Sequence, residues 1–486
     1  MSGRKYIWRG IIGIFLLYVI FAGVSRHVKM NRLTHDLQYG SKTAKLAAVK
    51  ELMRRDRLYD TMQEMPKAAK IRVLDVVEQV PGKLTIKQCL VLLKDADADV
   101  RTRVTEALAI LAKDRIELLI PAMKDSDGNV QAGAKDALVA IGPKVIPYVT
   151  KAARETDLRA AAFEVLIRVG EPSIPAITSL LRDKDQDVRM AAADSLSKIT
   201  DKNGKPSHLG TLALLQAAKD TAAVRRVAIS SLCTICDPRA TDLLVQVLTH
   251  TRDDGEVRAR AARALSVIGG PKAIDALTSS LGDWDLKVRT SVITGLQTMG
   301  ETAVQPVVAA MASGSTEVRR AGASVLEKID SPGALQALLQ LAKDSDPVVR
   351  ASVARGLGFQ SSSVRSDVLV SMLADPNGAV ADTAANVLAE LGANGNISVI
   401  DNLAAVLLSS ADDVVKFRAA DALSSIGRPS VNRLLQCLGK GGTSAKYAIY
   451  ALGRIRDPRI KGTLKKFVAA SDPNLAWVAK RALANM

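Results

Sequence analysis

The chain has 486 residues, of which 48% are hydrophobic but only 3% aromatic, and its formal net charge is +17. Large globular cores usually use aromatic side chains as bulk, so this composition indicates helices packed closely through Ala, Val, Leu and Ile. The charge lies at the two ends: residues 1–60 carry +8, residues 428–486 carry +10, and the stretch between them carries −1. A protein that binds nucleic acid along its length should be basic along its length, so this distribution argues against that class.

The first 30 residues predict a membrane anchor. Residues 10–24 (GIIGIFLLYVIFAGV) are uncharged and apolar between basic flanks, and a span of about 7–25 is long enough for a single transmembrane helix. A cleaved signal peptide is the alternative, with Ile20-Phe-Ala22 as a weak cleavage site. Because both flanks are basic, the positive-inside rule gives only a modest preference, which places the rest of the chain outside the cytoplasm, in the periplasm of a Gram-negative cell. A cytoplasmic placement stays open.

Residues 31–486 are dominated by one recurring pattern, V-x-x-x-A-x-x-x-L, usually with Arg directly after the Val. It occurs fifteen times, most copies 28 to 31 residues apart, with loop-like inserts near 200–210 and 392–398. The spacing puts three apolar residues on one helix face, and a second apolar helix separates successive copies. Two-helix units of this length predict a solenoid in which each unit contacts only its neighbours. Clear copies are VRARAARAL (257–265), VRTSVITGL (288–296), VRRAGASVL (318–326) and VRASVARGL (349–357).

The repeat resembles the HEAT-repeat superfamily, and most of all the short bacterial repeats called phycobilisome-lyase-like. The stretch Ala451-Leu-Gly-Arg-Ile-Arg-Asp-Pro458 matches the signature of that subtype. The resemblance covers about residues 40–486. It implies an all-α fold, a right-handed superhelix of about 15 two-helix repeats after one transmembrane helix, and it says little about activity.

The stretch DADADVRTRVTE (95–106) has acidic residues where a calcium-binding EF-hand loop has them. That loop needs Gly at its sixth position, whereas Val100 stands there and already belongs to a helix. We therefore interpret Asp97 and its counterparts as caps of the helix that carries the repeat pattern. No metal and no cofactor are predicted.

The Arg that follows the first pattern residue, which is Val in seven copies and Leu158 in one, is expected from the resemblance to pair with an Asp of an adjacent repeat and so to form a ladder along the stack. The ladder residues are Arg101, Arg159, Arg189, Arg225, Arg258, Arg289, Arg319 and Arg350.

Two features are candidates for partner binding. Trp284 stands in a turn where other repeats carry small or polar residues, so it either contacts a partner or folds back on its neighbour repeat. The basic C-terminal cap, residues 428–486, favours an anionic partner such as an acidic protein, a phospholipid surface or a polyanion. A solvated terminal cap is the alternative. The cap candidates are Lys446, Tyr447, Tyr450, Arg454, Arg456, Arg459, Lys461, Lys465 and Lys466.

No constellation of catalytic residues is recognisable in the sequence. The leading hypothesis is therefore a membrane-anchored scaffold or adaptor that binds partner proteins through the solenoid surface and has no catalytic activity of its own. A lyase that attaches a bilin or another tetrapyrrole is the alternative implied by the repeat subtype. Binding of a polyanion or a nucleic acid is the second alternative.

Overall fold

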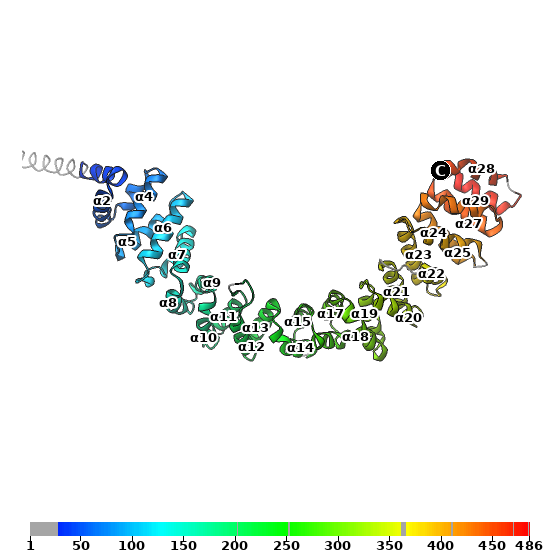
Figure 1. Cartoon of the computed structure of the whole chain (residues 1–486), viewed down its shortest axis with the longest axis horizontal. Coiled ribbons are helices and arrows are strands. Elements are labelled where there is room, and N and C mark those ends of the chain that lie inside the picture. Colours follow the sequence, from blue (N-terminus) through cyan, green and yellow to red (C-terminus); the bar gives the residue numbers. More distant parts are fainter. Residues whose placement is uncertain are drawn as a thin grey trace, which may run out of the picture. The chain divides into compact units, whose positions relative to one another are not determined.

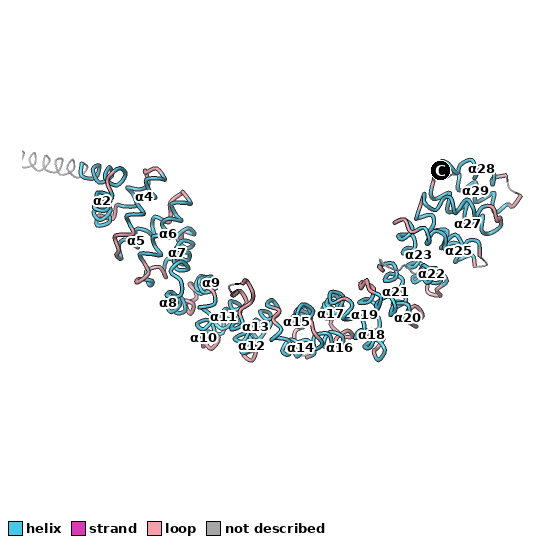
Figure 2. Tube along the Cα trace, in the orientation of Figure 1, coloured by secondary structure: helices cyan, strands magenta, loops and turns pink. Residues whose placement is uncertain are grey.

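The computed structural model describes residues 28–486 except 202, 251–252, 361–365, 410–411, 470 and 485. The chain divides into two compact units, Met1–Ile235 and Cys236–Met486. Both consist of helices joined by short loops (Figures 1 and 2). Outside the helices of the described part, the only β-type pairing is a single bridge between Thr200 and Pro206, inside the predicted insert near 200–210.

In the first unit, residues 28–39 are helical and are followed by a series of short helices. The α-helices are α2 (Lys42–Arg54), α3 (Leu58–Gln63), α4 (Lys67–Val77), α5 (Lys83–Leu92), α6 (Ala98–Leu111), α7 (Gly128–Ile141), α8 (Ile146–Ala152), α9 (Arg159–Val169), α10 (Ile174–Leu180), α11 (Gln186–Leu196), α12 (His208–Ala217) and α13 (Ala222–Ile235). The 3₁₀ helices are η1 (Ile116–Leu118), η2 (Pro121–Lys124), η3 (Gly142–Val145) and η4 (Glu171–Ser173).

The second unit continues the same alternation. Its α-helices are α14 (Thr241–Thr249), α15 (Gly255–Ile268), α16 (Pro271–Ser279), α17 (Leu286–Met299), α18 (Glu301–Ser313), α19 (Thr316–Leu326), α20 (Pro332–Leu341), α21 (Pro347–Phe359), α22 (Ser366–Ser371), α23 (Gly378–Ala393), α24 (Ile397–Leu408), α25 (Asp413–Ile426), α26 (Val431–Leu438), α27 (Gly442–Ile455), α28 (Lys461–Val468) and α29 (Pro473–Ala484). Its 3₁₀ helices are η5 (Pro238–Ala240), η6 (Met372–Ala374), η7 (Arg428–Ser430) and η8 (Pro458–Ile460).

All fifteen copies of the repeat pattern fall on helices, which we call the motif helices: α2, α4, α6, α7, α9, α11 and every odd-numbered helix from α13 to α29. The pattern residues form the core, as in α15, where Ala261 and Leu265 are fully buried and Val257 is 7% exposed. Small residues let neighbouring helices approach closely, which explains a core with few aromatic side chains.

Glycines end several motif helices where the sequence places Ile-Gly. Gly142, Gly269 and Gly427 adopt φ values of +78°, +73° and +80°, a left-handed conformation that only glycine adopts without strain. The chain therefore turns directly into the next helix, in which Pro stands within the first turn at Pro143, Pro271 or Pro429.

Within each unit the helices pack in two rows. In the second unit each motif helix packs against the next, from α15 through α17, α19, α21, α23, α25 and α27 to α29. The other helices form a second row, in which α14 packs on α16, α16 on α18 and α18 on α20. Neighbouring motif helices therefore present the same sequence positions side by side along one face.

The structure confirms an all-α chain of stacked helix pairs over the described residues. A right-handed superhelix over one continuous domain from 31 to 486 stays a prediction, as does the separate status of residues 1–30. The second predicted insert, 392–398, covers the end of α23 and the start of α24, with Gly395 at φ +93° between them.

The membrane localisation requires correction. No helix in the described part of the chain is long and apolar enough to span a bilayer. The segment of about 7–25, on which the prediction of a single-pass anchor depended, lies outside the described residues. A membrane-anchored protein, in the periplasm or elsewhere, is therefore not supported.

Candidate partner-binding pocket

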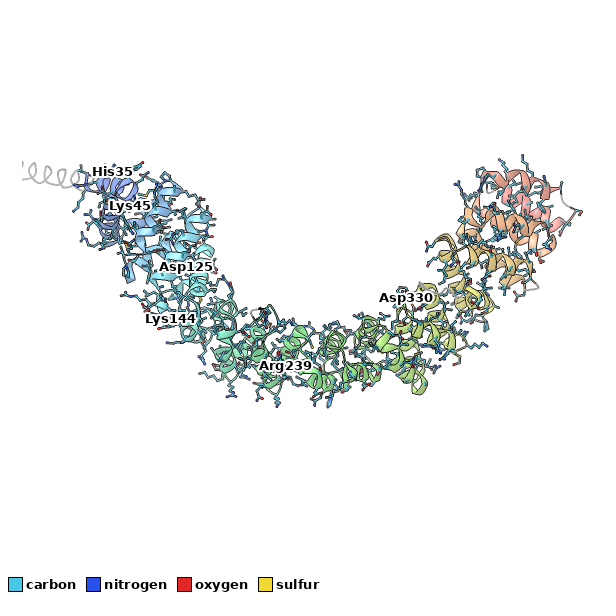
Figure 3. All side chains as sticks on the ribbon, in the orientation of Figure 1. His35, Lys45, Asp125, Lys144, Arg239 and Asp330 are labelled. Carbon is cyan, nitrogen blue, oxygen red and sulfur yellow. The ribbon has the colours of Figure 1, made fainter. Side chains whose placement is uncertain are left out.

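The acidic turns that resemble EF-hand loops join the two helices of a repeat. In the turn before α6, Asp95 Oδ1 accepts a hydrogen bond from the N–H of Asp97 at 2.9 Å. Asp97 in turn accepts from the N–H groups of Asp99 and Val100, at the first turn of the helix. The pairs Asp183–Asp185, Asp344–Asp346 and Asp125–Asp127 repeat this arrangement. Asp125 is labelled in Figure 3. The predicted capping role is confirmed.

The first aspartate of such a turn also receives a cation from the preceding repeat. Lys70 Nζ lies 2.7 Å from Asp95 Oδ2, and both side chains are largely buried. Arg154 Nε lies 2.7 Å from Asp183 Oδ2 in the same way. At least one carboxylate oxygen of each of these aspartates thus accepts from an N–H donor. No metal-binding group of His, Cys, Asp or Glu occurs among the described residues.

Five of the eight proposed ladder arginines reach an aspartate of the next repeat. These pairs are Arg159 with Asp185, Arg189 with Asp220, Arg258 with Asp283, Arg319 with Asp344 and Arg350 with Asp375.

Arg101 and Arg289 instead donate to backbone carbonyls of their own turns. For Arg289 the sequence gives the reason. The receiving aspartates Asp185, Asp220, Asp283, Asp344 and Asp375 stand three to five residues before the motif Val, and residues 313–315 before Val318 include no aspartate. Arg225 also has an interaction partner.

The pair of Arg350 and Asp375 has the most complete geometry. Nε and Nη2 of Arg350 lie 2.7 and 2.8 Å from the two carboxylate oxygens, and Nη1 donates to the carbonyls of Asp344 and Ser345 at 2.8 and 3.2 Å. The guanidinium holds the pKa of Asp375 below its usual range. One side chain thus connects its own turn to the turn of the next repeat.

Trp284 lies between the two alternatives predicted for it. Its side chain is 69% exposed, yet the guanidinium of the fully buried Arg258, from the previous motif helix, lies 5.5 Å from the ring centroid. Trp284 therefore has a cation behind it and a large face open to solvent. Contact of Trp284 with a partner stays a prediction.

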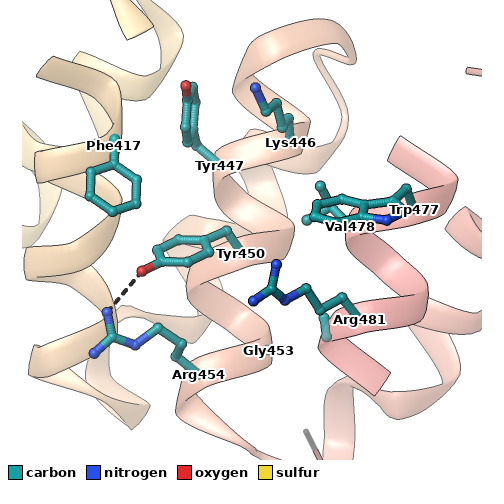
Figure 4. Close-up of a pocket in the computed structure, with 10 residues that line it drawn as sticks. Phe417, Lys446, Tyr447, Tyr450, Gly453, Arg454, Trp477, Val478 and Arg481 are labelled. Atoms are coloured by element: carbon teal, nitrogen blue, oxygen red, sulfur yellow. Dashed lines mark hydrogen bonds between the residues drawn. The ribbon is translucent and has the colours of Figure 1, made fainter. Parts of the chain in front are cut away.

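A cavity of about 640 Å³ lies along α25, α27 and α29 (Figure 4). Four of the chain's sixteen aromatic side chains line it: Phe417 from α25, Tyr447 and Tyr450 from α27, and Trp477 from α29. Such a concentration, in a chain with so few aromatic residues, marks the cavity as a candidate site.

Each ring on α27 and α29 is accompanied by a cation. Lys446 Nζ lies 5.0 Å from the Tyr447 ring centroid, and the Arg454 and Arg481 guanidinium carbons lie 5.7 and 5.4 Å from the rings of Tyr450 and Trp477. Figure 4 shows Arg481 between Tyr450 and Trp477, and Arg454 extending to the hydroxyl of Tyr450. The pocket therefore combines apolar faces with positive charge at its rim.

Two carboxylates of α25 lie beside pocket residues. Asp413 faces Tyr447, and burial together with Asp413 raises the pKa of the Tyr447 hydroxyl. Asp421 lies beside Tyr450 and is already engaged. The hydroxyl of Tyr450 donates to its Oδ1 at 3.2 Å, and Arg454 pairs with the same oxygen while donating to the Tyr450 hydroxyl at 2.9 Å. The pKa of Arg454 is raised, first by the hydrogen bond with Tyr450. Arg454 thus positions Tyr450, whereas Lys446 and Arg481 form no ion pair with any described residue.

Of the nine predicted residues of the basic C-terminal cap, four line the pocket and five do not. Lys446, Tyr447, Tyr450 and Arg454 line the pocket, although Tyr447 is only 8% exposed. The other five lie elsewhere: Arg456 ends α27 with φ +56°, Arg459 pairs with Asp457, and the three exposed lysines Lys461, Lys465 and Lys466 belong to α28.

Sequence reasoning missed Phe417, Trp477 and Arg481, which belong to the motif helices on either side of α27. A signal was present. Phe417 and Trp477 stand two residues after the first pattern residue of their motif helices, as Lys446 does on α27, and equal positions on neighbouring motif helices lie side by side.

A model of HEAT repeats matches the chain over residues 146–213, 211–297, 280–358, 304–389 and 366–445. Together these matches span more than half of the chain. The chain belongs to the HEAT-repeat family. No curated protein matches this HEAT-repeat chain in sequence.

Solved structures of Kap121p are similar to this HEAT-repeat chain at low identity. The structure of Kap121p bound to Nup53p aligns at 13% identity with a TM-score of 0.44, covering 93% of this chain and 52% of the other. The structure bound to RanGTP aligns at 14% identity with a TM-score of 0.42, covering 90% and 54%. The chain spans about half the length of these structures, and the likeness carries no inference about its partners.

Proposed function

We propose that this HEAT-repeat protein is a scaffold or adaptor that binds a segment of a partner protein in the pocket along α25, α27 and α29. The observation that supports this most directly is that one open cavity is lined by four aromatic side chains, Phe417, Tyr447, Tyr450 and Trp477. Protein–protein hot spots favour Trp, Tyr and Arg in such pockets, and a volume of about 640 Å³ accepts a large apolar side chain with its neighbours.

The charge around the pocket selects an acidic segment. The cap of residues 428–486 has twelve Lys and Arg against two Asp and Glu. Both acids are used locally: Asp457 by Arg459, which holds the pKa of Asp457 at about 2, and Asp472 by the N–H of Asn474. Lys446 and Arg481 already face the aromatic rings, so they would repel a cationic ligand. Carboxylates beside an apolar anchor would form ion pairs with both cations.

The other two hypotheses have less support. No observation in the pocket favours the tetrapyrrole lyase implied by the repeat subtype, so we assign no catalytic step. A single-stranded nucleic acid could stack on exposed aromatic rings, but residues 61–427 carry a net charge of −1. A single-stranded oligonucleotide therefore serves as a competitor in the binding test.

The proposal is tested by panning a random 16-residue peptide display library on the immobilised full chain. We expect enriched peptides to carry Phe, Trp or Leu between acidic residues. Trp477→Ala should weaken their binding at least about tenfold, since a buried aromatic anchor contributes about 2 kcal/mol or more. Trp284→Ala removes a tryptophan of similar exposure from another site, and should leave binding unchanged.

Two results would overturn the proposal. The first is enrichment no better than on a bare support, or of basic peptides. The second is equal binding of the enriched peptides by the Trp477→Ala and Trp284→Ala variants. Displacement of the peptides by an oligothymidylate at lower concentration than by the free peptide would instead favour a nucleic-acid site.

A further inference from the structure

A second cavity, of about 420 Å³, lies between α21 and α23 in the same unit. Phe359 lines it with its side chain 46% exposed, and Lys328 Nζ lies 5.4 Å from the ring centroid. Val387 of α23 forms part of the facing wall, and Asn386 is exposed at the rim. This cavity repeats the pairing of an open aromatic ring with a cation, two to three motif helices before the first pocket.

Both cavities open on the same face of the motif-helix row. Counted from the first pattern residue of each motif helix, the two pockets use the same positions, +3, +6 and +10. These residues are Thr383, Asn386 and Glu390 on α23, and Tyr447, Tyr450 and Arg454 on α27. Because α23 packs on α25 and α25 on α27, equal positions point the same way along the row.

The charge of the second cavity differs from that of the first. Its arginine, Arg355, pairs with the buried Glu327 at 2.9 Å, and Lys328 lies 3.8 Å from the same carboxylate. The exposed Glu390 adds one negative charge at the rim. The cavity therefore has no surplus of positive charge and suits an uncharged apolar side chain rather than an acidic one.

The distance between the cavities fits one extended chain. From the gap between α21 and α23 to α27 is two and a half helix spacings, or roughly 20–25 Å at the usual 8–10 Å each. An extended segment covers that distance in roughly six to eight residues at about 3.3 Å per residue. The surface between the cavities carries Arg418, which pairs with Asp382, and Asp421, which pairs with Arg454. The residues of the bound segment between its two anchors therefore need no apolar side chain.

We propose that the partner segment is bipartite: an acid-flanked aromatic anchor occupies the first pocket, and an uncharged apolar anchor six to eight residues away occupies the second. This inference rests on the proposed function and adds the second site and the spacing. Binding at two linked sites should strengthen affinity by about tenfold or more over the first anchor alone, because the second anchor binds at high effective concentration.

The test uses synthetic peptides and the full chain in calorimetric titrations. The one-anchor probe is acetylated, amidated Glu-Glu-Phe-Glu-Glu. The two-anchor probes add a Leu three, seven or fourteen residues before or after the Phe, through Gly-Ser spacers. We expect one order of anchors, at the seven-residue spacing, to bind at least about tenfold tighter than the one-anchor probe.

Two variants of the second cavity test whether the gain in affinity comes from that cavity. Phe359→Ala removes the ring, and Asn386→Arg places bulk in the cavity from an exposed helix position without removing any core contact. Each should abolish the gain and leave the affinity of the one-anchor probe unchanged. A gain below about twofold in both orders, or a gain that survives both variants, overturns the bipartite inference. Failure of the one-anchor probe itself to bind would contradict the proposed function instead.

Discussion

The guanidinium of Arg350 shows how a single residue joins two repeats. It donates to carbonyls of its own turn and to both oxygens of Asp375 in the next turn, and both side chains are mostly buried. Arg289 makes the same carbonyl contacts but has no aspartate to receive it. The two residues therefore form a matched pair, in which only one spans the interface between repeats.

Replacing Arg350 by Ala should lower the free energy of unfolding by about 2–3 kcal/mol, because it leaves a mostly buried carboxylate without its cation. Arg289→Ala should cost only about 1 kcal/mol, since it removes hydrogen bonds to carbonyls that water can reach. Urea unfolding followed by circular dichroism measures both. Equal losses would show that the inter-repeat pair adds nothing beyond the local hydrogen bonds.

The same pair predicts a pH dependence. The folded-state pKa of Asp375 lies below its ordinary value because of Arg350, so the stability that the pair contributes is fully present above about pH 4. It is lost as the pH falls through the lowered folded-state pKa. The difference in unfolding free energy between the natural chain and Arg350→Ala should be constant from pH 7 to about pH 5 and shrink below about pH 4. A difference that grows on acidification would contradict this assignment.

At the scale of the helix, close packing of small residues determines the walls of the pocket. Gly453 of α27 faces Ala482 of α29, and a Cβ at Gly453 would lie 2.5 Å from Ala482 Cβ and 2.8 Å from its Cα. Backbone therefore approaches backbone at this point, and α27 and α29 set the width of the cavity between them. A Cβ added at Gly462 of the neighbouring α28 would have no atom within 4 Å.

Gly453→Ala should push α29 away from α27. We expect a loss of about 1–3 kcal/mol in unfolding free energy and weaker binding of the Glu-Glu-Phe-Glu-Glu probe. Gly462→Ala, the matched control, should raise stability by up to about 1 kcal/mol through better helix propensity and leave binding unchanged. Thermal unfolding measures the stability of the two variants, and calorimetry measures their peptide binding. Equal stability and equal binding of the two variants would contradict a role for close packing at Gly453.

The helices were predictable from the sequence because the repeat pattern records which face of each is buried. The pocket was only half predictable. Lys446, Tyr447, Tyr450 and Arg454 lie on one helix and stood out as a local cluster, whereas Phe417 and Trp477 lie about 30 residues away in sequence. Their proximity results from stacking of repeats. Arg456 and Lys465 belonged to the same basic stretch but lie on other surfaces, since charge density in sequence does not say which face a side chain occupies.

At the scale of the whole molecule, most residues that line the pocket belong to one of the two basic ends of the chain. The middle of the chain is nearly neutral, which suits stacked repeats whose ion pairs are satisfied within the stack, while the last 59 residues carry +10. The described helices give no support for a membrane anchor, so partner binding is ascribed to the repeat surface alone. Partner binding therefore depends on whether the pocket recognises an acidic segment with an apolar anchor.

The most direct measurement follows the fluorescence of Trp477, which is 60% exposed in the pocket, in a chain whose other tryptophans are removed as Trp8→Phe and Trp284→Phe. Titration with acetylated, amidated Glu-Glu-Phe-Glu-Glu should give a saturable change, and Lys-Lys-Phe-Lys-Lys and Glu-Glu-Ser-Glu-Glu should give none. Arg481→Glu should abolish the change, whereas Lys480→Glu, the same charge reversal on the adjacent exposed residue, should retain it. Binding of the lysine peptide, or equal effects of the two reversals, would contradict the account.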